Sequence, residues 1–168
     1  IMNRETKIAI IGGGIGGLTT ALCLEHFGFQ NYTVFEQQPS FGEVGAAISL
    51  WPNALYVFQE LNLYQRLSEE WGEIQAAYVR TDKGKIISKT SPKYDLPMVC
   101  IHRAHLHRVL REFLPIAKLK SGHKLKDLKI GADCSKLIFE NGGEEQADIV
   151  IGADGIHSFV RKLLIGDG

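Results

Sequence analysis

The sequence predicts an α/β fold that opens with a βαβ unit, and three observations support this. Lys7 to Ile11 is a short isoleucine-rich run bounded by glycine, as expected of a buried strand. From Ile15 onward, apolar residues recur at helical spacing, and Gly28 stands where that helix would end. Tyr32 to Phe35 is a second apolar run of strand-forming residues. Strand, glycine turn, helix and strand in this order indicate a βαβ unit.

The middle of the chain changes its pattern twice. Gln37 to Gly45 is polar and rich in turn-forming residues, so we expect a loop, and Pro52 is well placed as the first residue of a helix that reaches Glu60. Further on, Ala76 to Thr81 and Lys85 to Thr90 flank a short turn and predict an antiparallel hairpin. We expect this hairpin to belong to a different sheet from the opening strands.

The last third returns to the opening pattern. Arg103 to Leu114 has helical periodicity and is stopped by Pro115. Lys124 to Ile130 and Lys136 to Phe139 predict two strands of a hairpin or meander. Ile149 to Ile151 predicts a final strand, followed by a turn and by a helix to Leu164 that Ser158 would cap.

Composition narrows the class of protein. The 168 residues carry 45% hydrophobic and 23% charged side chains, which is typical of one globular domain. Nineteen basic and nineteen acidic residues balance, and no long basic run follows the chain. A nucleic-acid partner is therefore not expected. The composition does not indicate an oligomeric state.

The cysteines and the apolar opening segment bear on location. Cys23, Cys100 and Cys134 are odd in number and far apart, so they predict neither a disulfide framework nor a zinc site, and they favour the cytoplasm. Ile8 to Leu24 is uncharged, but its five glycines would weaken a spanning helix, and no signal-cleavage site follows it. We expect no membrane span.

The glycine turn carries the first chemical signal. Gly12, Gly14 and Gly17 fit the pattern GxGxxG between a strand and a helix. The first glycine allows the tight turn, the second lets a pyrophosphate approach, and the third lets the helix pack on the strand. The helix N-terminus would then stabilise the phosphate charges. By itself, however, such a turn can be only a tight strand-to-helix corner.

An acidic residue at the end of the second strand supports a dinucleotide site. Glu36 lies nineteen residues after Gly17, where its carboxylate can accept hydrogen bonds from the ribose hydroxyls of an adenosine. The alternative is a solvated acid at a strand end. These features favour a Rossmann-like fold, but they do not distinguish NAD from FAD.

Further segments carry a family resemblance. Ten positions resemble the extended fingerprint of flavoproteins that bind two dinucleotides: Ile8, Ile10, Gly12, Gly14, Gly17, Ala21, Leu24, Gly28, Val34 and Glu36. Gly45 to Leu55, Ile101 to Leu110 and Ile151 to Arg161 together resemble the class A FAD-dependent aromatic hydroxylases, particularly the salicylate-hydroxylase-like branch. The resemblance runs across nearly the whole chain. It implies an FAD-binding Rossmann-like domain with an antiparallel β excursion from the substrate domain.

The resemblance also assigns site residues. It places Arg103 at the phosphate and ribityl region of the flavin, a role that suits its planar charged fork, whereas the alternative is a surface salt bridge. Asp154 and Gly155 match the family's Asp-Gly turn, which without the resemblance would be only a corner. The predicted cofactor-binding set is Gly12, Gly14, Ile15, Gly16, Gly17, Glu36, Gln37, Gly45, Ala46, Ala47, Arg103, Leu125, Asp154 and Gly155. Leu125 would contact the adenine through its main chain.

Three histidines in one segment raise the question of a metal. His102, His105 and His107 do not share one helical face, and no neighbouring carboxylate or cysteine completes a ligand set in the sequence. We therefore expect helix-surface histidines and no metal site.

The resemblance implies a function and a domain division. The intact protein is expected to be an NADPH- or NADH-dependent flavin monooxygenase, in which reduced FAD and O₂ form a C4a-hydroperoxide that hydroxylates a small aromatic substrate. Alternatives are a related flavin reductase or epoxidase acting on an isoprenoid, and an inert FAD- or nucleotide-binding fragment. Residues 1–71 and 102–168 would form the FAD-binding domain, and residues 72–101 would be strands of an incomplete substrate domain. No catalytic acid or base is assigned.

The family's later Gly-Asp motif and its substrate-covering sheet have no counterpart in the sequence. We therefore expect a fragment of a longer protein, with weak FAD binding and an exposed apolar face on the excursion.

Overall fold

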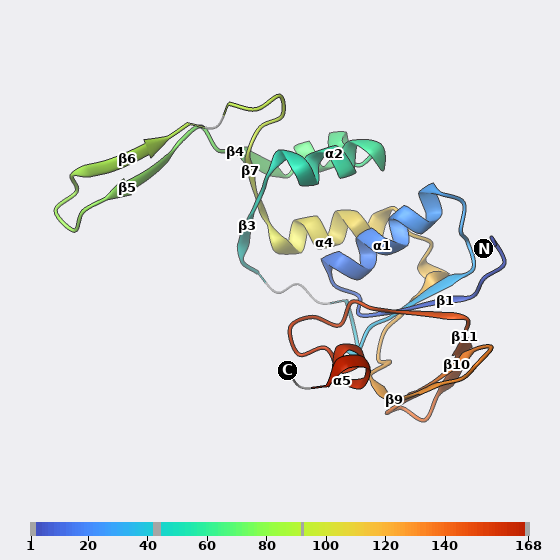
Figure 1. The fold of residues 1–168 in the computed structure, drawn as a ribbon. Coiled ribbons are helices and arrows are strands. Elements are labelled where there is room, and N and C mark those ends of the chain that lie inside the picture. Colours follow the sequence, from blue (N-terminus) through green and yellow to red (C-terminus); the bar gives the residue numbers. More distant parts are fainter. Residues whose placement is uncertain (1–2, 42–44, 92, 167–168) are drawn as a thin grey trace. The chain divides into compact units, whose positions relative to one another are not determined.

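The structure is a computed structural model that describes residues 3–41, 45–91 and 93–166. The chain divides into two compact units (Figure 1), which are residues 1–43 with 110–168, and residues 44–109. Part of the predicted loop from Gln37 to Gly45, namely residues 42–44, lies outside the described residues.

The first unit is built on a parallel sheet. Its strands are β1 (Ile8–Ile11), β2 (Tyr32–Phe35), β8 (Leu119–Lys120) and β12 (Ile149–Gly152), in the order β12-β1-β2-β8. Helix α1 (Ile15–His26) connects β1 to β2, so the predicted βαβ unit is confirmed. All four residues of β1 are buried, as expected of a parallel strand covered on both faces.

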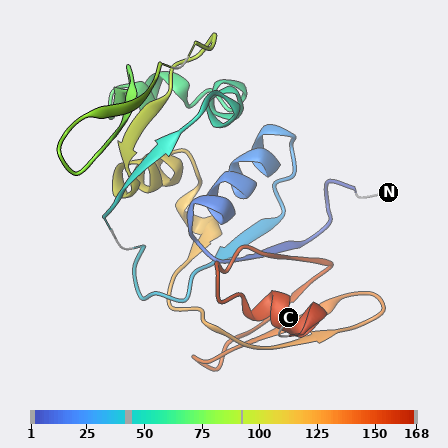
Figure 2. The same ribbon diagram turned by 60° about the vertical axis from the view of Figure 1, so that its left-hand side comes forward.

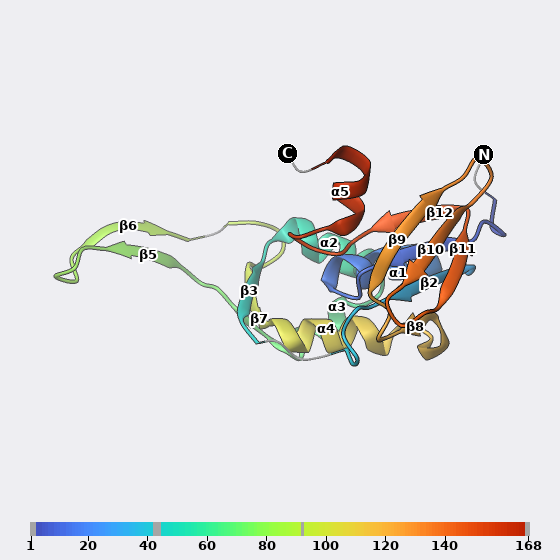
Figure 3. The ribbon, with the colours of Figure 1, turned by 90° about the horizontal axis from the view of Figure 1, so that it is seen from below.

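An antiparallel meander packs against one face of this sheet (Figure 3). It consists of β9 (Leu125–Ile130), β10 (Ser135–Phe139) and β11 (Glu144–Ala147) in the order β11-β10-β9. Helix α5 (Phe159–Ile165) contacts β12 and β9. The shared core consists of Ala9, Ile11, Phe35, Leu125, Leu128, Leu137, Phe139, Ala147 and Val160. Since side chains alternate along a strand, Ile10 points the other way, toward α1.

The ends of the helices in this unit follow the sequence signals. Gly28 has φ +79°, so it stops α1 in the left-handed conformation that favours glycine. The Ser158 hydroxyl accepts a hydrogen bond from Arg161 N at 2.9 Å, which confirms the predicted N-cap of α5. A short 3₁₀ turn, η1 (Ile116–Lys118), follows Pro115 and leads into β8.

The second unit contains a small antiparallel sheet. Its strands β3 (Ala47–Leu50), β4 (Trp71–Glu73) and β7 (Val99–His102) have the order β3-β7-β4, and Figure 2 shows cyan β3 beside yellow-green β7. The sequence did not predict this sheet. Helices α2 (Pro52–Glu60) and α3 (Tyr64–Ser68) lie between β3 and β4 in the chain. Pro52 is the first residue of α2, as predicted.

Helix α4 and a hairpin complete the chain. Helix α4 (Arg103–Glu112) begins in the second unit directly after β7 and ends two residues before the predicted end. Strands β5 (Ala77–Arg80) and β6 (Ile86–Thr90) form the predicted antiparallel hairpin, which pairs with no other strand among the described residues. The hairpin exposes Tyr78, Val79, Ile86 and Ile87.

No helix in the described ranges is long and apolar enough to cross a membrane.

A partly buried cluster of charged side chains links the parallel sheet to the meander. Glu145 of β11 lies 2.7 Å from Lys120 Nζ and 3.2 Å from Lys7 Nζ. The hydrogen bond from Lys120 is the main cause that holds the pKa of Glu145 below its ordinary value, Lys7 adds to it, and partial burial opposes it. Protonation of Glu145 should therefore weaken the first unit.

The depressed pKa predicts how stability depends on pH. The contribution of Glu145 is fully present above its unfolded-state value of 4.5 and is lost as pH falls through the lower folded-state value. Glu145→Gln should lower the free energy of unfolding by about 0.5–1 kcal/mol at pH 7, because the side chains of Lys7 and Lys120 are 45% and 39% exposed. It should have no effect at a pH below both the folded-state and the unfolded-state pKa of Glu145. Urea denaturation of both chains from pH 7 to pH 3 measures this convergence.

Glu144→Gln is the matched control, since it removes a more exposed ion pair, with Lys136 of β10, at the adjacent residue of β11. A constant difference between Glu145→Gln and the unsubstituted chain at every pH would contradict the assignment.

Candidate functional site

The glycine turn between β1 and α1 is as tight as the sequence pattern indicates. Gly12 has φ +111°, and a Cβ at this position would lie 2.2 Å from Ala153 O. A Cβ on Gly17 would lie 1.9 Å from Gly12 O, so α1 packs directly on the turn. The backbone itself therefore requires glycine at the first and third positions of the pattern.

The same turn leaves room on its other side. Apart from the neighbouring residues in the chain and the backbone of α1, no described atom lies within 4 Å of a Cβ built on Gly14 or Gly16. Gly14 is the N-cap residue of α1, no described side chain caps it, and the first turn contains no acidic residue. Backbone N–H groups at the positive end of a helix thus adjoin open space, which is the arrangement that binds a phosphate.

Glu36 reaches back to this turn from the end of β2. Its Oε2 accepts a hydrogen bond from Gly13 N at 2.7 Å, and its Oε1 accepts one from Gln38 N at 2.8 Å. Each carboxylate oxygen keeps a lone pair for a further donor. Glu36 is therefore a half-buried, oriented acceptor rather than a freely solvated acid. The open helix end and the oriented carboxylate fit the pyrophosphate and ribose of a dinucleotide.

Two residues beside Glu36 were not predicted from the sequence. Gly13 is buried, and a Cβ on it would lie 2.4 Å from Phe41 Cε1 and 2.9 Å from Glu36 Cβ. The Phe41 ring thus lies at the same edge of the turn as Glu36. The additional glycine between Gly12 and Gly14 was the only sequence signal for such a close approach.

The Asp-Gly corner after β12 meets the glycine turn. Asp154 N would lie 2.9 Å from a Cβ on Gly12, and Gly155 has φ +83°. Asp154 Oδ2 accepts hydrogen bonds from Phe159 N at 2.7 Å and Val160 N at 3.1 Å, so the carboxylate caps α5. Its Oδ1 is buried and has no hydrogen-bond partner among the described residues. The corner is thus both a turn and a helix cap, and its role toward a cofactor stays a prediction.

The second unit brings four other predicted residues together. Arg103 N donates to Ala46 O at 2.8 Å, and Ala47 pairs with His102 across β3 and β7. A Cβ on Gly45 would lie 2.6 Å from His102 Cε1. The segment Gly45 to Ala47 therefore runs beside the first residue of α4, where Arg103 stands.

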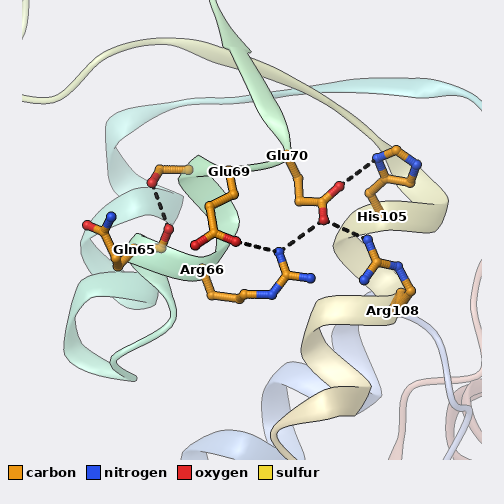
Figure 4. A network of polar contacts seen from close by, with 7 residues as sticks. Gln65, Arg66, Glu69, Glu70, His105 and Arg108 are labelled. Carbon is orange, nitrogen blue, oxygen red and sulfur yellow. Dashed lines mark hydrogen bonds and ion pairs between the residues drawn. The ribbon is translucent and has the colours of Figure 1, made fainter.

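A charged network fixes the start of α4 within the second unit (Figure 4). Glu70 Oε1 accepts hydrogen bonds from Arg108 at 2.7 Å and Arg66 at 3.0 Å, and Glu70 Oε2 lies 3.0 Å from His105 Nδ1. These donors, Arg108 first, hold the pKa of Glu70 below its ordinary value. His105 and Arg108 lie two and five residues after Arg103, so the network orients the helix turn that carries Arg103.

The remaining predicted site residues occupy simple positions. Ile15 is the first residue of α1, and Gln37 is exposed directly after Glu36. Leu125 begins β9, where its side chain is buried in the core and its backbone pairs with Phe139. Within the described part of the chain, no group of three His, Cys, Asp or Glu side chains could hold a metal ion.

Comparisons with known proteins agree with this geometry. Residues 5–165 match the family described as "FAD binding domain". The chain is 35% identical over 174 residues to 3-amino-4-hydroxybenzoate 2-monooxygenase of Streptomyces cremeus, covering 99% of this chain and 44% of that protein. It is 31% identical over 172 residues to 6-hydroxynicotinate 3-monooxygenase of Pseudomonas fluorescens, covering 98% and 44%.

A solved structure supports the same relationship. The chain superposes on a variant of Klebsiella pneumoniae HpxO, complexed with FAD, with a TM-score of 0.86 and 25% identity, covering 97% of this chain and 43% of that one. The chain thus spans less than half the length of the relatives it matches. It belongs to the FAD binding domain family, and both named relatives are monooxygenases, in agreement with the resemblance of its sequence to the class A FAD-dependent aromatic hydroxylases.

Proposed function

We propose that this chain binds the AMP half of FAD at the glycine turn. The pyrophosphate lies at the N-terminus of α1 beside Gly14, and the ribose hydroxyls donate to Glu36. The observation that carries this assignment is the open space at Gly14 and Gly16 next to an oriented carboxylate with free lone pairs. Gly12 and Gly17 keep the turn tight enough for both groups to converge.

The other predicted residues have proposed roles toward the same cofactor. Arg103 binds the phosphate and ribityl region through its guanidinium, and the segment Gly45 to Ala47 passes near the flavin ring. Leu125 contacts the adenine through its main chain. Asp154 and Gly155 shape the corner beside Gly12, and the backbone contact there supports the assignment.

We further propose that the whole protein is an NAD(P)H-dependent flavin monooxygenase that hydroxylates a small aromatic substrate with O₂. The two named relatives are monooxygenases of a hydroxybenzoate and a hydroxynicotinate, which are small aromatic carboxylates. FAD supplies the redox chemistry, and this chain's residues bind and orient the cofactor. No observation favours an isoprenoid substrate or an inert fragment.

The proposal also assigns the parts of the chain to two domains. Residues 1–71 and 102–168 form the FAD-binding domain, and residues 72–101 contribute strands to a substrate domain. The paired but otherwise uncovered β5–β6 hairpin, with its exposed apolar side chains, supports this role. The odd, distant cysteines support a cytoplasmic location.

Cofactor selectivity tests the proposed site. The chain should bind FAD at least about tenfold more tightly than FMN, because FMN lacks the adenosine and one phosphate that the turn and Glu36 would hold. Quenching of flavin fluorescence on titration of each cofactor with the chain measures both dissociation constants. Equal affinities, or no binding of FAD, would contradict the proposed site.

Activity is tested on the whole protein. NADH or NADPH oxidation and formation of a hydroxylated product from small aromatic carboxylates, followed by chromatography, would support the monooxygenase proposal. Bound FAD that neither nicotinamide cofactor reduces would overturn it and leave the FAD site intact.

A further inference from the structure

Phe41 forms an apolar edge beside Glu36, whose carboxylate we propose binds the ribose. The position of a Cβ on Gly13 shows how close these groups are, since it would touch both Phe41 Cε1 at 2.4 Å and Glu36 Cβ at 2.9 Å. Gly13 N is the donor to Glu36 Oε2. The ring, the glycine and the carboxylate therefore lie together at one edge of the turn.

Arg111, in the last turn of α4, holds Phe41 in two ways. Its Cζ lies 5.0 Å from the centroid of the Phe41 ring, and its Nη1 donates to Phe41 O at 3.2 Å. One guanidinium thus binds both the side chain and the backbone of the same residue. The ring cannot turn away from Gly13 without losing its cation–π contact.

Hydrogen bonding explains only part of the position of Arg111. Arg111 Nε is buried and has no hydrogen-bond partner among the described residues. A buried guanidinium is normally better satisfied than this, because an unpaired donor away from water is costly. The contacts that this position of Arg111 does provide are those with the ring and the backbone oxygen of Phe41.

We propose that Arg111 is a positioning residue that fixes Phe41 as an apolar wall beside Glu36, and that this wall strengthens binding of the cofactor's adenosine ribose. The inference rests on the proposed FAD site. The wall keeps water from one side of the carboxylate, and hydrogen bonds from the ribose hydroxyls to Glu36 are stronger where water competes less.

A double-mutant cycle on the 168-residue chain tests the proposal. Phe41→Ala and Arg111→Met should each raise the dissociation constant for FAD about tenfold, a size typical of a desolvated cation–π contact. The double variant should bind FAD no more weakly than Phe41→Ala, because Arg111 acts through the ring. Arg111→Lys keeps the charge but loses the planar stack, so it should show a smaller increase.

Controls separate binding from folding. Melting temperatures without FAD establish that each variant is folded at the assay temperature, and Arg111→Lys is the mildest variant should Arg111→Met not fold. Arg80→Met removes a similar contact, with Arg80 Cζ 5.3 Å from the Tyr78 ring on the exposed hairpin, and should leave FAD affinity unchanged.

The outcomes separate the role of Arg111 and Phe41 from the proposed FAD site itself. FAD affinity unchanged in folded Phe41 and Arg111 variants would overturn this inference alone. Additive effects in the double variant would show that Arg111 does not act through Phe41. No FAD binding by the unsubstituted chain would overturn the proposed site, and this inference with it.

Discussion

Replacing Gly12 by alanine is expected to lower the free energy of unfolding by about 2–6 kcal/mol, a large share of the stability of a small domain. Two costs add. Alanine at φ +111° is strained, and its Cβ would lie 2.2 Å from a backbone oxygen, that of Ala153, which cannot move aside as a side chain can. Urea denaturation of the cofactor-free chain, followed by circular dichroism, measures the loss.

Gly16→Ala is the matched control for this experiment. Gly16 lies in the first turn of α1 and faces open space, so alanine should stabilise the chain by up to about 1 kcal/mol through helix propensity. If Gly12→Ala unfolded at the same urea concentration as the unsubstituted chain, the packing of β1, α1 and the Ala153 corner would differ from that described.

Gly14→Ala is expected to separate folding from cofactor binding. Gly14 has φ −76°, which alanine accepts, and a Cβ there meets no described atom, so stability should change by no more than about 1 kcal/mol. The methyl group would, however, enter the space through which the pyrophosphate approaches the backbone. The dissociation constant for FAD should rise about 100-fold.

Flavin fluorescence titration at a temperature where both chains are folded measures this effect. Gly72→Ala serves as the control, because Gly72 of β4 also faces open space and belongs to none of the proposed cofactor contacts, and it should bind FAD within about threefold of the unsubstituted chain. A folded Gly14→Ala chain with undiminished affinity would show that the pyrophosphate does not lie against Gly14.

Local sequence predicts the elements whose structure depends on residues close together in the chain. The run from Ile8 to Ile11 is apolar because both faces of β1 are covered, so its burial appears directly in the residue types. Gly28 and Ser158 end or begin helices through their own conformation or hydroxyl. The βαβ unit, the hairpin and the caps therefore followed from patterns only a few residues long.

The elements that sequence could not predict depend on partners far along the chain. The β3-β7-β4 sheet pairs strands of three or four residues, and Ala47 meets His102 across a long intervening segment. β8 has only two residues, too few for a periodic signal. Such strands are specified by pairing and burial rather than by their own composition.

The candidate site shows the same division. Glu36 was predicted from its distance to the glycine turn, whereas Phe41 and Arg111 stand seventy residues apart and carry no shared motif. The sequence did not predict that Asp154 caps α5, because these hydrogen bonds depend on where the helix N-terminus lies in the folded chain. These contacts form only when the chain folds, so a short sequence motif cannot predict them.

The proposed site places the AMP half of FAD at the glycine turn. Amide NMR spectra of the ¹⁵N-labelled chain, recorded as FAD is added, test it most directly. We predict that the largest shift changes fall on Gly13, Gly14, Gly16 and Gly17, and that ADP reproduces them. Largest changes on the β5–β6 hairpin, with the glycine amides unmoved, would contradict the account.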